Sequence, residues 1–362
     1  MGTITRGIAN NVVTGGKLDG TDGLSGTVSA SNIANASLTN ITSVSPSLGF
    51  AVTSVASDPV SPLEGQIWYN TTSKTLKGYQ NVVTNSWASG GNMNTARRAL
   101  AGAGTQTAAL GFGGYITATS TSSESYDGTL WTATPSLNTA RQLLAGFGTQ
   151  TSAVACGGES GPLLSSTEKY NGSSWTSSGS LNTARVRFAG VGIQTAGLAF
   201  GGFPPVTATE SFNGSSWTTV TSMNTGGKGL AGAGIQTAAL GFGGYLAPGV
   251  TLSTATESWN GSSWTAVSNM NTARYGLAGA GTQTLAIAFG GTFDPPVVGN
   301  TELWNGTSCT SNPTGLATAR ATLGGAGTQA ATLAFGGATP PVTATTEEWT
   351  GSALTVRTIT VS

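Results

Sequence analysis

The segment Ala-Gly-Ala-Gly-Thr-Gln-Thr-Ala-Ala-Leu-Gly-Phe-Gly-Gly at residues 101–114 decides the fold, because close copies of it recur along the chain. The final Gly-Gly pair begins at residues 113, 157, 201, 243, 290 and 336, so successive copies are 42 to 47 residues apart. Each copy continues with Glu-x-aromatic, an Asn-Gly or similar pair, usually a Trp, and a closing Asn-Thr-Ala-Arg or a variant of it. Self-similarity at a period of roughly 20 to 50 residues indicates a repeat architecture.

Each copy predicts four short strands. The first two are the Leu-Ala-Gly-Ala-Gly segment and the Ala-Ala-Leu-Gly-Phe run, whose small and apolar residues indicate strands buried on both faces. The third carries Glu-x-aromatic and the fourth carries the Trp. Asn171-Gly172 and its equivalents at 213, 260 and 305 favour positive φ, which predicts type I′ hairpin turns between the third and fourth strands. Asp127-Gly128 and Thr350-Gly351 occupy the same place. Four-stranded units at this period predict an all-β fold, a β-propeller.

The length variation of the copies is concentrated in one loop. From the Arg position to the second Gly of the pair the distance is 17 residues in all six copies, whereas from that Gly to the Glu it ranges from 8 to 13. In an up-and-down sheet this variable loop lies on the same face as the Asn-Thr-Ala-Arg connection. Variable loops on a rigid scaffold are typical of binding sites, although loops that nothing constrains also drift in length. The candidate binding residues are Tyr115, Phe203, Pro204, Tyr245, Phe293, Asp294 and Pro340.

The charged residues of the copies recur with the repeat. Only 8% of the chain is charged, so periodic Arg and Glu indicate a structural use. We expect Arg–Glu or Arg–backbone hydrogen bonds between neighbouring units; a ring of Arg that binds an anion is the alternative. The residues are Arg97, Arg141, Arg185, Arg274, Arg320, Glu124, Glu168, Glu210, Glu257, Glu302 and Glu347. The fourth copy departs from the pattern, with Gly227 in the Arg position and Lys228 beside it.

Composition argues against catalysis. The chain has no histidine, which removes most zinc sites and the Ser-His-Asp triad. Its two cysteines, Cys156 and Cys309, stand where other copies have Phe or Trp, so we expect small core residues and no disulfide. One Glu per copy gives no distinct acid–base pair, and no phosphate loop is present. We therefore expect that the chain is not an enzyme and that it binds no metal and no cofactor. Zero net charge and short apolar runs predict neither nucleic-acid binding nor membrane insertion.

The first 90 residues differ from the rest. Residues 1–47 are rich in Gly, Ser, Asn and Thr and are too poor in apolar residues to form a core alone, so we expect them to order on partner chains or by self-association, for example as a trimer. Residues 48–90 favour a diverged seventh blade with strands at 48–56, 65–70, 75–80 and 85–89; the alternative is six blades and an independent hairpin over 65–80. Residues 91–362 are the propeller repeats.

Two resemblances suggest a role. The Gly-Gly pair, the aromatic residue, the Trp and the later Arg resemble the kelch repeat, which implies a kelch-like β-propeller and no particular activity. The segment Gly65-Gln-Ile-Trp-Tyr-Asn-Thr-Thr-Ser-Lys-Thr-Leu-Lys resembles a hairpin segment of bacteriophage tail and fibre proteins. Together they imply a virion protein that is assembled in the host cytoplasm and attached to other virion proteins through residues 1–47. Its propeller would contact a host-surface glycan; the alternative is a purely structural or decorating virion protein without a receptor.

Overall fold

The computed structural model describes residues 52–63, 65–82, 85–204, 207–246, 251–292 and 296–359. The chain divides into two compact units, one of residues 1–83 with 352–362 and one of residues 84–351. The described part is all-β and contains no helix. The division differs from the boundaries expected from the sequence, since the C-terminal segment 352–362 belongs with the first unit and residues 84–90 belong with the repeats.

The second unit, residues 84–351, contains six four-stranded antiparallel sheets, which are numbered here along the chain. Sheet 1 has β5 (Ala101–Gly104), β6 (Ala109–Phe112), β7 (Ser123–Tyr126) and β8 (Trp131–Thr134). Sheet 2 has β9 (Ala145–Gly148), β10 (Ala153–Cys156), β11 (Thr167–Tyr170) and β12 (Trp175–Ser178). Sheet 3 has β13 (Ala189–Ile193), β14 (Ala196–Phe200), β15 (Thr209–Phe212) and β16 (Trp217–Val220). The expected strands are confirmed in these three sheets.

The other three sheets follow the same order. Sheet 4 has β18 (Ala231–Ile235), β19 (Ala238–Phe242), β22 (Thr256–Trp259) and β23 (Trp264–Ala266). Sheet 5 has β24 (Ala278–Gly281), β25 (Ala286–Phe289), β26 (Thr301–Trp304) and β27 (Cys309–Asn312). Sheet 6 has β28 (Gly324–Gly327), β29 (Ala331–Phe335) and β30 (Thr346–Thr350), with β4 (Ser86–Ser89) as its fourth strand. A small three-stranded sheet of β17 (Gly227–Lys228), β20 (Tyr245–Leu246) and β21 (Thr251–Leu252) lies in the fourth copy.

Glycine in the first strands lets neighbouring sheets approach closely. A Cβ on Gly102 would lie 2.6 Å from the carbonyl oxygen of Gly325 and 2.7 Å from the ring of Phe335. A Cβ on Gly146 would lie 2.5 Å from the Phe112 ring. Each Phe at the end of a second strand therefore packs where the next sheet has only a glycine, which explains the alternation of Ala and Gly in the repeat.

The first strands contact one another in the order β5, β9, β13, β18, β24 and β28, and β28 also contacts β5. The residue two positions before each first strand has a left-handed φ between 52° and 70°. The backbone N–H of each of these residues donates to the carbonyl of its counterpart in the preceding copy, and that of the first donates to the last, over 2.6 to 2.9 Å. The six residues are Ala99, Leu143, Arg187, Gly229, Gly276 and Thr322. The arrangement is propeller-like.

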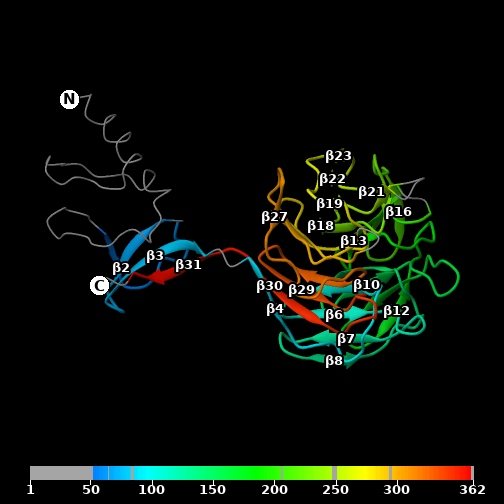
Figure 1. Cartoon of the computed structure of the whole chain (residues 1–362), viewed down its shortest axis with the longest axis horizontal. Helices are drawn as coiled ribbons and strands as arrows, with labels where there is room; N and C mark the ends of the chain where they lie inside the picture. Colours follow the sequence, from blue (N-terminus) through cyan, green and yellow to red (C-terminus); the bar gives the residue numbers. More distant parts are fainter. Residues whose placement is uncertain are drawn as a thin grey trace. The chain divides into compact units, whose positions relative to one another are not determined.

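The expectation of a seventh unit from residues 48–89 is wrong in its strand pairing. Strands form close to the expected places, but β4 pairs with β30 and completes sheet 6 (Figure 1). Trp87 of β4 thereby takes the place that Trp131 has in sheet 1, opposite an aromatic residue of the third strand. Thr350-Gly351 is consequently not a hairpin turn, because the chain leaves sheet 6 at this point.

The first unit holds a separate four-stranded sheet. It contains β1 (Thr53–Val55), β2 (Ile67–Asn70), β3 (Thr75–Val82) and β31 (Ala353–Thr358), and the red β31 lies beside the blue β3 (Figure 1). The hairpin expected over 65–77 is present as β2 and β3. Asp58 accepts hydrogen bonds from Trp68 Nε1 at 3.0 Å, Asn70 Nδ2 at 2.7 Å and Lys77 Nζ at 2.8 Å. These bonds, that of Lys77 above all, lower the pKa of Asp58 to about 2.

The turns between third and fourth strands correct the predicted turn type. Tyr170 pairs with Trp175, so the loop has four residues rather than two. Gly172 has a φ of +92°, but Asn171 is not among the residues of positive φ. Instead the Asn171 side chain accepts hydrogen bonds from the backbone N–H groups of Ser173 and Ser174, both at 2.9 Å. Asn is used here for its side-chain acceptor rather than for a left-handed backbone.

Two kinds of side-chain contact join neighbouring sheets, of which the first occurs in all six and the second in four. The Gln of each Gly-Thr-Gln-Thr turn or its variant donates to a third-strand residue of the preceding sheet, as Gln150 does to the Tyr126 carbonyl at 2.6 Å. In sheets 1, 3, 4 and 6 the fourth-strand Trp donates its indole N–H to the first Thr of the preceding third strand, as Trp217 does to Thr167 Oγ1 at 3.0 Å. Gln106 and Trp131 make the same contacts from sheet 1 to sheet 6.

Sheet 2 lacks the Trp–Thr bond, and this predicts a stabilising substitution. Ser123 stands where the other partners are Thr, and both its Oγ and Trp175 Nε1 are buried without a hydrogen-bond partner. Ser123→Thr is expected to restore the bond and to raise the free energy of unfolding by about 1 kcal/mol, the usual net value of such a bond. Urea denaturation measures it. Ser177→Thr, on an exposed position of β12, controls for the strand preference of Thr. An equal gain in both variants contradicts the prediction.

Candidate binding face

The repeat Arg and Glu side chains form buried ion pairs within their own sheets. Arg141 Nη2 lies 2.9 Å from Glu168 Oε1, and Arg141 Nη1 donates to the Ser166 carbonyl at 2.8 Å. The other pairs are Arg97–Glu124 at 3.1 Å, Arg185–Glu210 at 2.8 Å, Arg274–Glu302 at 3.2 Å, and Arg320–Glu347. All five Arg side chains are fully buried. They hold the third strand to the connection that precedes the first strand, and none of them lines a surface open to an anion.

The predicted contact between units is made by the backbone of these Arg residues rather than by their side chains. The Arg141 carbonyl accepts from the N–H of Gly114 in the preceding copy at 2.8 Å, and Arg185 does the same with Gly158 at 2.9 Å. Burial lowers the pKa of the guanidinium groups of Arg97, Arg185 and Arg320, and it lowers that of Arg274 to about 10, despite the neighbouring carboxylates. The ion pairs thus offset a real desolvation cost.

The fourth copy keeps the carboxylate without the Arg. Glu257 is buried and accepts from Asn224 N at 2.8 Å, Asn224 Nδ2 at 3.0 Å and Thr225 N at 2.6 Å. These match the donors that Glu168 has besides its Arg. The cation of this copy is Lys228, which lies in β17, at the end of the sheet that carries the variable loop.

The variable loops lie beside the Asn-Thr-Ala-Arg connections, as the spacing predicts. In every copy the residue after the Arg position pairs with the residue after the Gly-Gly pair, as Arg98 does with Tyr115 and Val186 with Phe203. In the fourth copy the same pairing becomes β17 with β20. The loops of the six copies therefore start from equivalent places at one end of the sheets.

The predicted binding residues differ in how available they are. Phe203 is 50% exposed, and Pro204 and Pro340 are exposed. Tyr115 is half-buried under Arg98, whose guanidinium carbon is 5.2 Å from the ring centroid. Tyr245 is buried and stacks on Tyr275 with centroids 4.1 Å apart, so it supports the face instead of offering contact area. Phe293 and Asp294 lie outside the described residues.

A cationic and aromatic cluster occupies the third to fifth copies. Lys228 Nζ lies 5.6 Å from the Phe203 ring centroid and 5.8 Å from that of Tyr245. Tyr245 in turn contacts Tyr275 of the next copy. Flat rings beside a cation present both a stacking surface and a charge to a ligand.

A cavity of about 140 Å³ lies within the ring of left-handed residues. Its wall includes all six of those residues and Tyr275, and Arg187 supplies its one charged side chain. Sequence reasoning missed this site, because the position two residues after the repeat Arg is Ala, Leu, Arg, Gly, Gly and Thr in turn and follows no pattern. Its constant spacing from the Arg position was the available signal.

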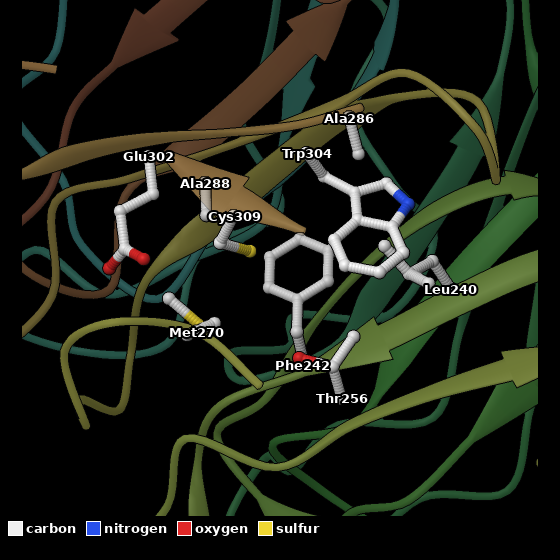
Figure 2. A pocket seen from close by; sticks show the side chains of 9 residues that line it. All are labelled: Leu240, Phe242, Thr256, Met270, Ala286, Ala288, Glu302, Trp304 and Cys309. Carbon is white, nitrogen blue, oxygen red and sulfur yellow. The ribbon is translucent and has the colours of Figure 1, made fainter. Parts of the chain in front are cut away.

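A second, smaller cavity follows from the replacement of a Trp by Cys309. Figure 2 shows Cys309 among Phe242, Trp304 and Met270, between sheets 4 and 5. Its volume is about 10 Å³, the room for about one water molecule, and most of its lining residues are apolar, with Thr256 and Glu302 as the exceptions. Burial raises the pKa of the Cys309 thiol to about 11 and that of the fully buried Cys156 to about 12. Both thiols are free, as expected; Cys156 is a core residue, as expected, whereas Cys309 is only half-buried.

The described residues bring together no three His, Cys, Asp or Glu side chains in a metal-binding group. No helix in the described part of the chain is long and apolar enough to cross a membrane. Comparison with protein-family models and with curated proteins finds no match to this chain.

Proposed function

We propose that this chain is a bacteriophage virion protein of the tail-fibre or baseplate type. Its unit of residues 84–351 is a six-bladed, kelch-like β-propeller that binds a host-surface glycan. Six blades are favoured over seven because β4 completes sheet 6. The hydrogen bonds that run from copy to copy and from the first copy to the last support a closed ring.

One observation carries the glycan assignment. The face of the variable loops carries Phe203, Lys228 and Tyr275. They lie next to the cavity within the ring of left-handed residues, which we call the axial cavity. Exposed aromatic rings stack on the apolar faces of sugars, and neighbouring donors bind their hydroxyl groups. By contrast, the buried Arg–Glu pairs are accounted for by structure alone. Residues 1–47 would attach the chain to other virion proteins or to further copies of itself, and the C-terminal strand β31 would help to build the sheet that follows them.

A glycan array probed with the full-length chain tests this function. We expect binding that Phe203→Ala reduces at least tenfold, as the loss of a central aromatic contact does at binding sites. Ile235→Ala is the matched control, since Ile235 is 54% exposed but lies at the turn between first and second strands, at the opposite end of the sheet. Absence of binding to every glycan, with the chain located in an interior position of a purified particle, would instead favour a decorating protein without a receptor.

A further inference from the structure

The cations on the loop face differ from those of the repeat. The five repeat Arg side chains are buried and paired with Glu. Arg187 is half-buried, lines the axial cavity, and has no ion-pair partner among the described residues. Lys228 directly precedes Gly229 in the cavity wall and likewise makes no ion pair in the described part of the chain. The wall itself contains no acidic side chain.

The polar groups of the wall select the kind of ligand. The backbone N–H and carbonyl groups of the six left-handed residues bind one another in the cycle described above. The Thr322 hydroxyl donates to the Ala321 carbonyl at 2.8 Å. The guanidinium of Arg187 is therefore the main source of unused donors in the cavity, and its planar fork matches a carboxylate. The Tyr275 ring forms part of the same wall.

The size of the cavity limits what enters it. A volume of about 140 Å³ is well below the roughly 300 to 1,000 Å³ of pockets that enclose drug-sized ligands. It suits a single small group at the end of a chain rather than the middle of an extended polymer. Charge, donor geometry and size together point to one chemical class.

We propose that the axial cavity binds the carboxylate-bearing terminal sugar of a glycan, with Arg187 bound to the carboxylate. The identification of the ligand as a sugar rests on the function proposed above, whereas the preference for an anion rests on the cavity alone. Arg187→Ala is a clean probe, because Ala99 occupies the equivalent left-handed position in the first copy. The fold therefore tolerates Ala at this place in the ring.

Ligand-observed NMR with the full-length chain tests the proposal, using glucuronate, galacturonate and N-acetylneuraminate against neutral glucose and galactose. We expect at least one acid to bind at least tenfold more tightly than its neutral counterpart, and Arg187→Ala to remove that preference. Arg98→Ala, which removes a cation that packs on Tyr115 outside the cavity wall, should leave it unchanged.

Three results would overturn the inference: no binding of any acid, equal binding of acids and neutral sugars, or full binding by the Arg187→Ala variant. The outcomes also separate the two proposals. Binding of neutral glycans that depends on Phe203 and not on Arg187 would keep the proposed function and remove the anion site. Binding of the acids by a chain that recognises no glycan on an array would keep the anion site and remove the proposed function.

Discussion

Glu168→Gln is expected to lower the free energy of unfolding by about 3 to 5 kcal/mol, whereas Glu257→Gln should cost only about 1 kcal/mol. Both carboxylates are buried, and both accept from the Asn and Thr of the preceding turn. Only Glu168 also neutralises a buried Arg. In Glu168→Gln the amide group faces the Arg141 guanidinium with a donor or a neutral acceptor, which leaves a buried cation without its countercharge.

The fourth copy makes this comparison internal to one molecule. It has Gly227 at the Arg position, so Glu257→Gln weakens hydrogen bonds and leaves no buried cation without a countercharge. Urea rather than guanidinium chloride is the suitable denaturant, since it is uncharged and keeps the ionic strength the same at every denaturant concentration. Similar losses in both variants would show that the carboxylates act through their Asn and Thr donors alone and that the Arg side chains do not depend on them.

The local parts of this fold were predictable because each copy carries the same short-range signals. The alternating Ala and Gly, the Glu-x-aromatic strand and the single Trp gave the strands of sheets 1 to 4 within a residue or two, whereas the fourth strand of sheet 5 carries Cys309 in place of the Trp. The repeat also placed the variable loops at one end of the sheets. The Asn171 turn was predicted in the right place but with the wrong geometry, because Asn favours both a left-handed backbone and side-chain capping, and sequence alone does not decide between them.

What the repeat could not predict is the pairing of the chain's outermost strands. Periodicity describes each copy and its neighbours, but β4 and β30 are more than 250 residues apart, and their pairing depends on how the first and last copies meet. The same holds for β3 and β31. The axial site was missed for a related reason: the residue at the position of Arg187 changes from copy to copy, and a repeat analysis looks for what recurs.

The fourth strand of sheet 6, β4, gives the second large expected effect on stability. Trp87 of β4 packs on Phe289 and Trp349 with ring centroids 5.1 and 5.4 Å apart, and its indole N–H donates to Thr301 Oγ1 at 2.9 Å. We expect Trp87→Ala to cost about 3 kcal/mol, the lower end of the range for truncation of a packed Trp, and less than Trp217→Ala at the equivalent place in sheet 3, because Trp87 is half-buried and Trp217 is buried. Thermal unfolding followed by Trp fluorescence compares the two variants.

Removal of the whole strand should be more severe than loss of its Trp. A chain of residues 91–351 leaves β30 without its outer partner and uncovers Trp349, which is fully buried in the intact protein. An exposed strand edge beside a large apolar side chain favours aggregation, so we expect no cooperative unfolding transition for this chain. Joining Trp349 to residues 87–90 through the four-residue Asn-Gly-Ser-Ser loop of sheet 2 should restore the transition, because it keeps the pairing of Trp349 with Trp87 and gives sheet 6 the hairpin that the others have. A cooperative transition in the truncated chain, or none in the repaired one, would mean that β4 does not close the repeats and that the first unit is needed for another reason.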